Sequence, residues 1–122
     1  MHAEEPHPQV RALLDRMDSL DFPDVSTLSV EGARRLFEKI GSSNRYRGGD
    51  VATTDREVDS DAGEIPIRVY RPREGDGTVT GETLPTTVYF HGGGFVVGSL
   101  DTHDALCRAI ADLWQTGVVS AD

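Results

Sequence analysis

One short run of residues carries the strongest chemical signal in this 122-residue sequence: His91-Gly92-Gly93-Gly94. A glycine costs about 1 kcal/mol relative to alanine inside a regular element, so three in a row indicate a need for backbone without side chains. Bare N–H groups can turn toward a ligand oxygen. The carbonyl oxygen of an ester becomes negatively charged during hydrolysis, and losing one fixed N–H donor costs roughly 3–4 kcal/mol of barrier. The run therefore predicts an oxyanion-binding loop.

The residues around the glycines predict a parallel α/β unit that positions them. Thr86–Phe90 is short, β-branched and aromatic, which is typical of a parallel-sheet strand covered on both faces. A helix over about Thr102–Trp114 follows, with Asp101 as its N-cap and Gly117 as its stop. Val118–Ala121 then begins another buried strand. The predicted buried face of the helix consists of Ala105, Leu106, Ala109, Ile110 and Leu113.

The first part of the chain predicts two amphipathic helices. Residues 9–20 place one apolar stripe after Pro8, a residue that helices accept at their start. A second helix follows Ser29 as N-cap and ends at Gly41 as C′. The polar stretch from 42 to 50 is predicted to be a loop. The two apolar faces are formed by Val10, Leu13, Leu14 and Met17, and by Val30, Ala33, Leu36, Phe37 and Ile40.

A β-hairpin is predicted between these helices and the glycine run. Val51–Asp59 forms a weak strand, and residues 61–63 form a turn. The next strand is predicted to be half-buried through Ile65, Ile67 and Val69, and Pro66 within it indicates an edge position or a bulge. The order hairpin, strand, loop, helix, strand predicts an α/β fold.

A longer match around the glycines points to a known family. The run from His91 to Asp104, with Cys107-Arg108 behind it, resembles the microbial hormone-sensitive-lipase family of carboxylesterases, which have the α/β-hydrolase fold. Ile67–Pro72 resembles the same family at the expected distance upstream. By this resemblance, residues 1–48 are N-terminal cap helices over the acyl and alcohol pockets. Residues 49–122 are the first strands and first helix of the hydrolase domain, with the sheet incomplete.

The resemblance also implies roles within the loop. Gly93 and Gly94 would supply the oxyanion-hole N–H groups, and Gly92 would shape the turn. His91 would hold the loop through side-chain hydrogen bonds rather than act as a base. The pair His103-Asp104 would be structural residues at the start of the helix.

The sequence departs from the family at the catalytic triad. The family nucleophile is a serine in a Gly-x-Ser-x-Gly elbow, and no such pentapeptide occurs here. Gly41-Ser42-Ser43 lacks the spacing, and Ser99 lacks the second glycine. The acid and the base come still later in the family's chain order, so no catalytic residue is expected in this chain. We therefore expect the isolated chain to be poorly stable and inactive.

The resemblance thus implies a carboxylic ester hydrolase that acts on short or medium acyl esters without a cofactor. The alternative is a truncated, non-catalytic fragment, or one half of a split enzyme that needs a missing C-terminal half. A nucleotide-binding loop is a further alternative because Asp122 ends the next strand, although Val97 replaces the third glycine of that fingerprint. Histidine spacing does not fit a metal site, and Cys107 is predicted to be a core residue.

The composition narrows the possible partners. The net charge is −9, with 21 acidic and 12 basic residues, of which Lys39 is the one lysine. Such a surface repels nucleic acid, and it indicates either adaptation to high salt or a GC-rich gene. The sequence holds no membrane-length apolar run, and its acidic start lacks the features of a signal peptide, so a cytoplasmic location is expected.

Overall fold

The computed structural model describes residues 5–20, 23–43, 46, 48–79, 81 and 83–122. Within these ranges lie three α-helices, one short 3₁₀ helix and four strands. The helices are α1 (Pro8–Asp18), η1 (Val25–Thr27), α2 (Val30–Ser43) and α3 (Asp104–Trp114). The strands are β1 (Val51–Ser60), β2 (Gly63–Pro72), β3 (Thr86–Phe90) and β4 (Gly117–Ala121).

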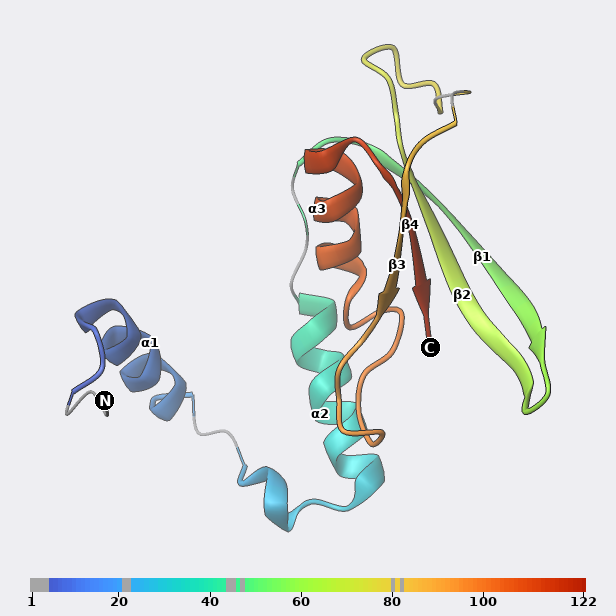
Figure 1. The fold of residues 1–122 in the computed structure, drawn as a ribbon. Helices are drawn as coiled ribbons and strands as arrows, with labels where there is room; N and C mark the ends of the chain where they lie inside the picture. The colour runs from blue at the N-terminus through green and yellow to red at the C-terminus, as the bar shows by residue number, and fades with distance from the viewer. Residues whose placement is uncertain (1–4, 21–22, 44–45, 47, 80, 82) are drawn as a thin grey trace.

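The four strands form one mixed sheet in the order β1-β2-β4-β3 (Figure 1). β1 and β2 make the predicted antiparallel hairpin, and β4 pairs antiparallel with β2. β3 and β4 are parallel neighbours joined through α3. A parallel pair needs such a crossover, which confirms the predicted α/β fold class.

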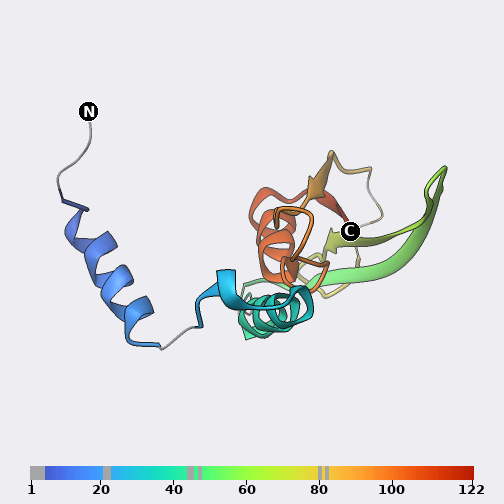
Figure 2. The ribbon, with the colours of Figure 1, turned by 90° about the horizontal axis from the view of Figure 1, so that it is seen from below.

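Helix α3 covers one face of the sheet and makes the small core. Tyr70, Val118, Cys107 and Ala111 are fully buried there. Burial raises the pKa of the Cys107 thiol. In Figure 1 helix α2 lies below α3, and α1 lies apart from the sheet both there and in the view from below (Figure 2).

The opposite face of the sheet carries no helix in the described part of the chain. Val88 and Phe90 are 57% and 75% exposed, so the prediction that β3 is covered on both faces is wrong for these residues. The prediction that β2 is half-buried through Ile65, Ile67 and Val69 holds for Ile67 and Val69, which are partly buried, and is wrong for Ile65. Tyr70 is the buried residue, whereas Ile65, on the other side of the strand, is 36% exposed.

Several predicted helix details also need correction. α2 continues to Ser43, so Gly41 is not its C′ residue. A Cβ on Gly41 would lie 2.6 Å from the Cα of Thr102, and glycine therefore serves close packing here. α3 begins at Asp104 after His103 rather than being capped by Asp101.

The far end and the buried face of α3 also differ from the prediction. Gln115, in the left-handed conformation, ends the helix, and Gly117 already belongs to β4. The small residues Cys107 and Ala111 face the sheet, whereas Leu106 and Leu113 are 46% and 71% exposed. Small side chains let the helix approach the sheet closely, so the side of α3 that carries them is the side that packs on the sheet.

Strand β2 is an inner strand, so the edge position predicted from Pro66 is wrong, and the β1–β2 register continues through Pro66 without a bulge. Pairing with β4 starts one residue later, at Ile67. Beyond that register the carbonyl oxygen of Pro66 still accepts a hydrogen bond from the Asp122 N–H at 3.0 Å, and the proline has no N–H to return the second bond of that pair. No helix in the described ranges combines the length and the hydropathy that crossing a bilayer requires.

Candidate functional site: the glycine loop after β3

The loop that follows β3 folds back on itself in a tight turn. Gly93, Gly94 and Phe95 have φ angles of +146°, +59° and +60° in succession. The N–H groups of Val96 and Val97 both donate to the carbonyl oxygen of Gly93, each at 3.0 Å. A Cβ at Gly93 would overlap the carbonyl oxygen of Val97, so this position requires glycine.

Three consecutive backbone donors in this turn, the N–H groups of Gly93, Gly94 and Phe95, have no protein acceptor among the described residues. Both glycines line a cavity of about 470 Å³ that also includes His91, Phe90 and Asp122. Unpaired N–H groups beside a cavity can bind a ligand oxygen, which is the arrangement that an oxyanion hole requires.

His91 packs beneath the loop with both ring nitrogens engaged. Nδ1 lies 2.9 Å from the carbonyl oxygen of Gly92, and Nε2 lies 3.0 Å from a carboxylate oxygen of Asp122. These contacts, the Gly92 carbonyl first, raise the pKa of His91. A Cβ at Gly98 would overlap the same imidazole, which therefore fills the space between the two ends of the loop.

The predicted structural pair His103-Asp104 lies where the loop enters α3. The His103 ring stacks on that of His91 at a centroid distance of 5.3 Å, and its Nδ1 is 2.9 Å from Oγ1 of Thr102. The Asp104 carboxylate accepts hydrogen bonds from Arg108 at 2.7 Å and from the hydroxyl of Tyr70 at 3.2 Å.

A second cavity lies between the glycine loop and α2. Its volume is about 390 Å³. Phe37 and Ile40 of α2 line it together with Gly93 and Val97 of the loop. An apolar space that adjoins unpaired N–H groups suits a ligand with an apolar body and a polar atom.

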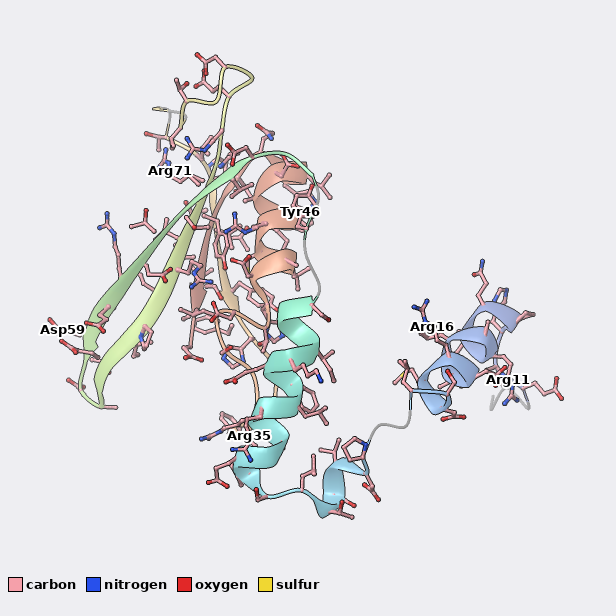
Figure 3. The ribbon with its side chains drawn as sticks, turned by 180° about the vertical axis from the view of Figure 1, so that it is seen from behind. Arg11, Arg16, Arg35, Tyr46, Asp59 and Arg71 are labelled. Carbon is pink, nitrogen blue, oxygen red and sulfur yellow. The ribbon has the colours of Figure 1, made fainter. Side chains whose placement is uncertain are left out.

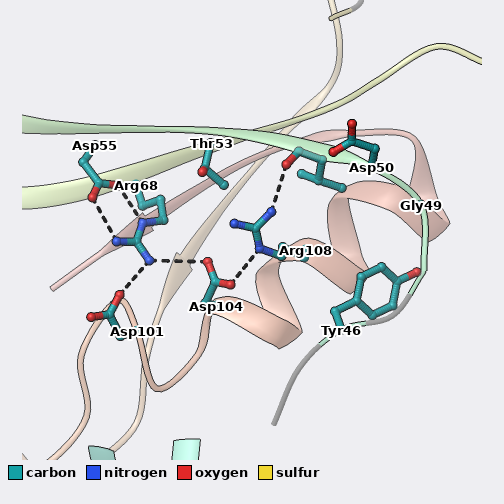
Figure 4. A pocket seen from close by; sticks show the side chains of 10 residues that line it. Tyr46, Gly49, Asp50, Thr53, Asp55, Arg68, Asp101, Asp104 and Arg108 are labelled. Atoms are coloured by element: carbon teal, nitrogen blue, oxygen red, sulfur yellow. Dashed lines mark hydrogen bonds and ion pairs between the residues drawn. The ribbon is translucent and has the colours of Figure 1, made fainter. Parts of the chain in front are cut away.

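Sequence reasoning missed Arg68, which joins the hairpin to the end of the glycine loop. Its guanidinium makes a bidentate pair with Asp55 at 2.6 and 2.9 Å and a bond of 2.8 Å to Asp101 (Figure 4). The hydrogen bond from Arg68 lowers the pKa of Asp55. The cluster lines a polar groove of about 770 Å³. The signal was the resemblance of Ile67–Pro72 to the family, which includes this arginine.

The chain segment before β1 is also tied to α3. The hydroxyl of Tyr46 donates to the Asp112 carboxylate at 2.6 Å, and the N–H of Gly49 donates to the same oxygen at 2.8 Å. Tyr46 lies beside α3 in the view from behind (Figure 3). These bonds lower the pKa of Asp112 and fix where β1 begins relative to the helix.

Comparison with known proteins agrees with this geometry. A family model described as alpha/beta hydrolase fold matches residues 87–122, which contain the glycine loop. A solved ester hydrolase from the metagenome of Lake Arreo superimposes with a TM-score of 0.79 at 34% identity, over 97% of this chain and 38% of that chain. An esterase from Pyrobaculum calidifontis gives a TM-score of 0.71 at 34% identity, over 97% of this chain and 35% of that chain.

This chain has the N-terminal part of the α/β-hydrolase fold. The predicted resemblance to carboxylesterases of the hormone-sensitive-lipase type is confirmed, because its curated relatives are ester hydrolases. The carboxylic ester hydrolase LipN of Mycobacterium tuberculosis is 52% identical over 72 residues, which are 59% of this chain and 18% of LipN. An ethyl acetate hydrolase of Pseudomonas putida is 40% identical over 90 residues, which are 69% of this chain and 26% of that hydrolase.

The chain therefore spans about a fifth to a quarter of these curated relatives and 38% of the Lake Arreo ester hydrolase. The glycine loop does not resemble a dinucleotide site in its surroundings. Such a loop opens directly into a helix, whereas residues 95–103 separate Gly94 from α3. The structure thus gives the nucleotide-binding alternative no support.

Proposed function

We propose that this chain provides the oxyanion hole of a serine carboxylic ester hydrolase. The N–H groups of Gly93 and Gly94 would donate to the carbonyl oxygen of a small acyl ester as that oxygen becomes negatively charged. One observation carries the proposal. Both N–H groups lack a protein acceptor in the described chain and border a cavity, in a turn that residue 93 can form only as glycine.

The rest of the catalytic machinery would come from hydrolase residues outside these 122. The serine nucleophile, its base and its acid have no counterpart here, so the chain alone would give no turnover. Residues 1–48 would act as cap, and residues 49–122 as the first part of the catalytic domain. The cavity beside Phe37 and Ile40 would hold a short or medium acyl or alcohol group.

The cellular location of the protein and its adaptation to high salt are also proposals. A cytoplasmic location is the first of these proposals. Adaptation to high salt is supported by the net charge of −9 and the single lysine.

A hybrid enzyme tests the proposed function. Residues 1–122 replace the structurally matched 38% of the Lake Arreo ester hydrolase, which supplies the remaining residues. We expect the hybrid to hydrolyse p-nitrophenyl acetate and butyrate, and the 122-residue chain to show no hydrolysis above buffer. Labelling by a fluorophosphonate counts the reactive serines. A folded, labelled hybrid that hydrolyses no ester would contradict the proposal.

A further inference from the structure

One face of α2 contacts the glycine loop along two turns of the helix. Arg34, Phe37 and Gly41 are spaced at i, i+3 and i+7 and therefore share a face. Gly41 packs against the backbone of Thr102, and Phe37 lines the cavity that also contains Gly93. Arg34 donates from Nε to the carbonyl oxygen of Val96 at 2.8 Å. The helix thus contacts the loop at its tip and at its exit.

The loop needs such support because its backbone is strained. Phe95 is not glycine, yet it has a φ of +60° and a fully exposed side chain. A left-handed conformation costs an ordinary residue roughly 1–2 kcal/mol. Among the described residues, Arg34 is the one side chain that hydrogen-bonds to the backbone of residues 93–98. It bonds to the carbonyl oxygen of Val96, which directly follows Phe95.

The bond from Arg34 is linked to an oxyanion donor through two peptide groups. Arg34 holds the carbonyl end of the Val96–Val97 peptide, and the N–H end of the same peptide donates to the carbonyl oxygen of Gly93 at 3.0 Å. That carbonyl and the N–H of Gly94 are opposite ends of one planar trans peptide. Fixing the Gly93 carbonyl therefore also fixes the direction of the Gly94 N–H.

We propose that Arg34 is a positioning residue that, through the Val96 carbonyl, sets the direction of the Gly94 N–H group. The proposal rests on the proposed oxyanion role of the loop. Arg34 touches none of the reacting atoms and acts through two backbone peptides.

The test in the hybrid enzyme compares Arg34→Ala with the control Arg35→Ala. Arg35, labelled in Figure 3, is the next residue of α2, and its side chain makes no hydrogen bond within the described part of the chain. For Arg34→Ala we expect kcat per labelled serine to fall about fivefold, the equivalent of one hydrogen bond, with KM within about twofold. Arg34→Lys keeps a cationic donor and should recover part of the rate. Arg35→Ala should match the parent.

A merely structural role would lower the fraction of labelled serine but leave kcat per labelled serine unchanged, and that result would overturn the proposal. An equal loss in Arg35→Ala would also overturn it. If Arg34→Ala does not fold, Arg34→Lys takes its place. An unchanged kcat per labelled serine in Arg34→Lys would then overturn the proposal.

A second readout separates this proposal from the proposed function. Hydrogen exchange of the ¹⁵N-labelled 122-residue chain follows the amides of Val96 and Val97 without any catalysis. Arg34→Ala should speed their exchange about fivefold, while the amides of α3 keep their rates. If the parent hybrid is inactive, the oxyanion function fails, and unchanged exchange at Val97 would then reject the Arg34 contact as well.

Discussion

Replacing the loop glycines one at a time by alanine separates the effect of steric overlap from the effect of backbone strain. At Gly93 an added Cβ would overlap the carbonyl oxygen of Val97, and a φ of +146° is rarely adopted by a side-chain-bearing residue. The turn would have to open. Two hydrogen bonds onto the Gly93 carbonyl, worth about 1 kcal/mol each, would be lost together with the direction of the oxyanion donors. We expect kcat of the hybrid enzyme to fall about 10²–10³-fold.

The neighbouring glycines should behave differently. At Gly94 a Cβ would meet no atom within 4 Å, so the substitution adds only the strain of a φ of +59°, roughly 1–2 kcal/mol, and the N–H remains. We expect Gly94→Ala to lower Tm but to retain kcat within about fivefold. Gly92 has no left-handed φ and equally open space, which makes Gly92→Ala the matched control with parental kcat and Tm.

The assay is hydrolysis of p-nitrophenyl butyrate by the three hybrid variants, with kcat divided by the number of labelled serines. Thermal unfolding followed by circular dichroism gives Tm in parallel. The reasoning is refuted if Gly93→Ala keeps the parental kcat in a folded hybrid. It is also refuted if Gly92→Ala reduces kcat as strongly as Gly93→Ala, because the loss would then not follow the turn geometry.

Three further predictions concern stability and association of the 122-residue chain. Gly41→Ala should destabilise it by about 1–3 kcal/mol through the clash with Thr102, although alanine normally favours a helix by about 1 kcal/mol. Urea unfolding checks this against Gly32→Ala, whose Cβ would lie 3.3 Å from the Ser29 hydroxyl and at ordinary contact distance from Leu28. His91 lies between Gly92 and Asp122 and stacks on His103, and its pKa is raised. Its protonation therefore stabilises the fold below about pH 6.5, and this contribution is lost as the pH rises through the folded-state pKa. Tm should therefore fall from pH 6 to 8 less in His91→Gln than in the parent, and an equal fall would contradict the assignment. Phe90→Ser should reduce dye binding by exposed apolar surface and self-association in sedimentation at unchanged stability, because Phe90 is 75% exposed.

The local elements could be predicted from the sequence because their signals are local. β3 occupies the predicted residues Thr86–Phe90, and the periodicity of residues 9–20 predicted α1 correctly within two residues at the C-terminal end. The glycine run predicted a turn without side chains, and Gly93 has a conformation that requires it.

Long-range contacts gave no comparable signal. Arg34 reaches a carbonyl 62 residues away, and Arg68 binds Asp101 across 33 residues. Periodicity also failed to choose the buried face of α3, because apolar residues occur on both sides of that helix. The sheet selects the small residues Cys107 and Ala111, and the larger Leu113 is left exposed.

The uncovered sheet face and the free edge of β3 together indicate where the rest of an active site would lie. Parallel strands are normally buried on both faces, yet in the described chain Val88 and Phe90 remain largely exposed. β3 pairs only with β4 there, so a further parallel strand can add at its free edge. The carboxyl end of such a strand would lie beside His91–Gly94, because parallel strands end at the same edge of a sheet. A serine following that strand would then face the unpaired N–H groups of Gly93 and Gly94, which is the geometry that ester hydrolysis needs.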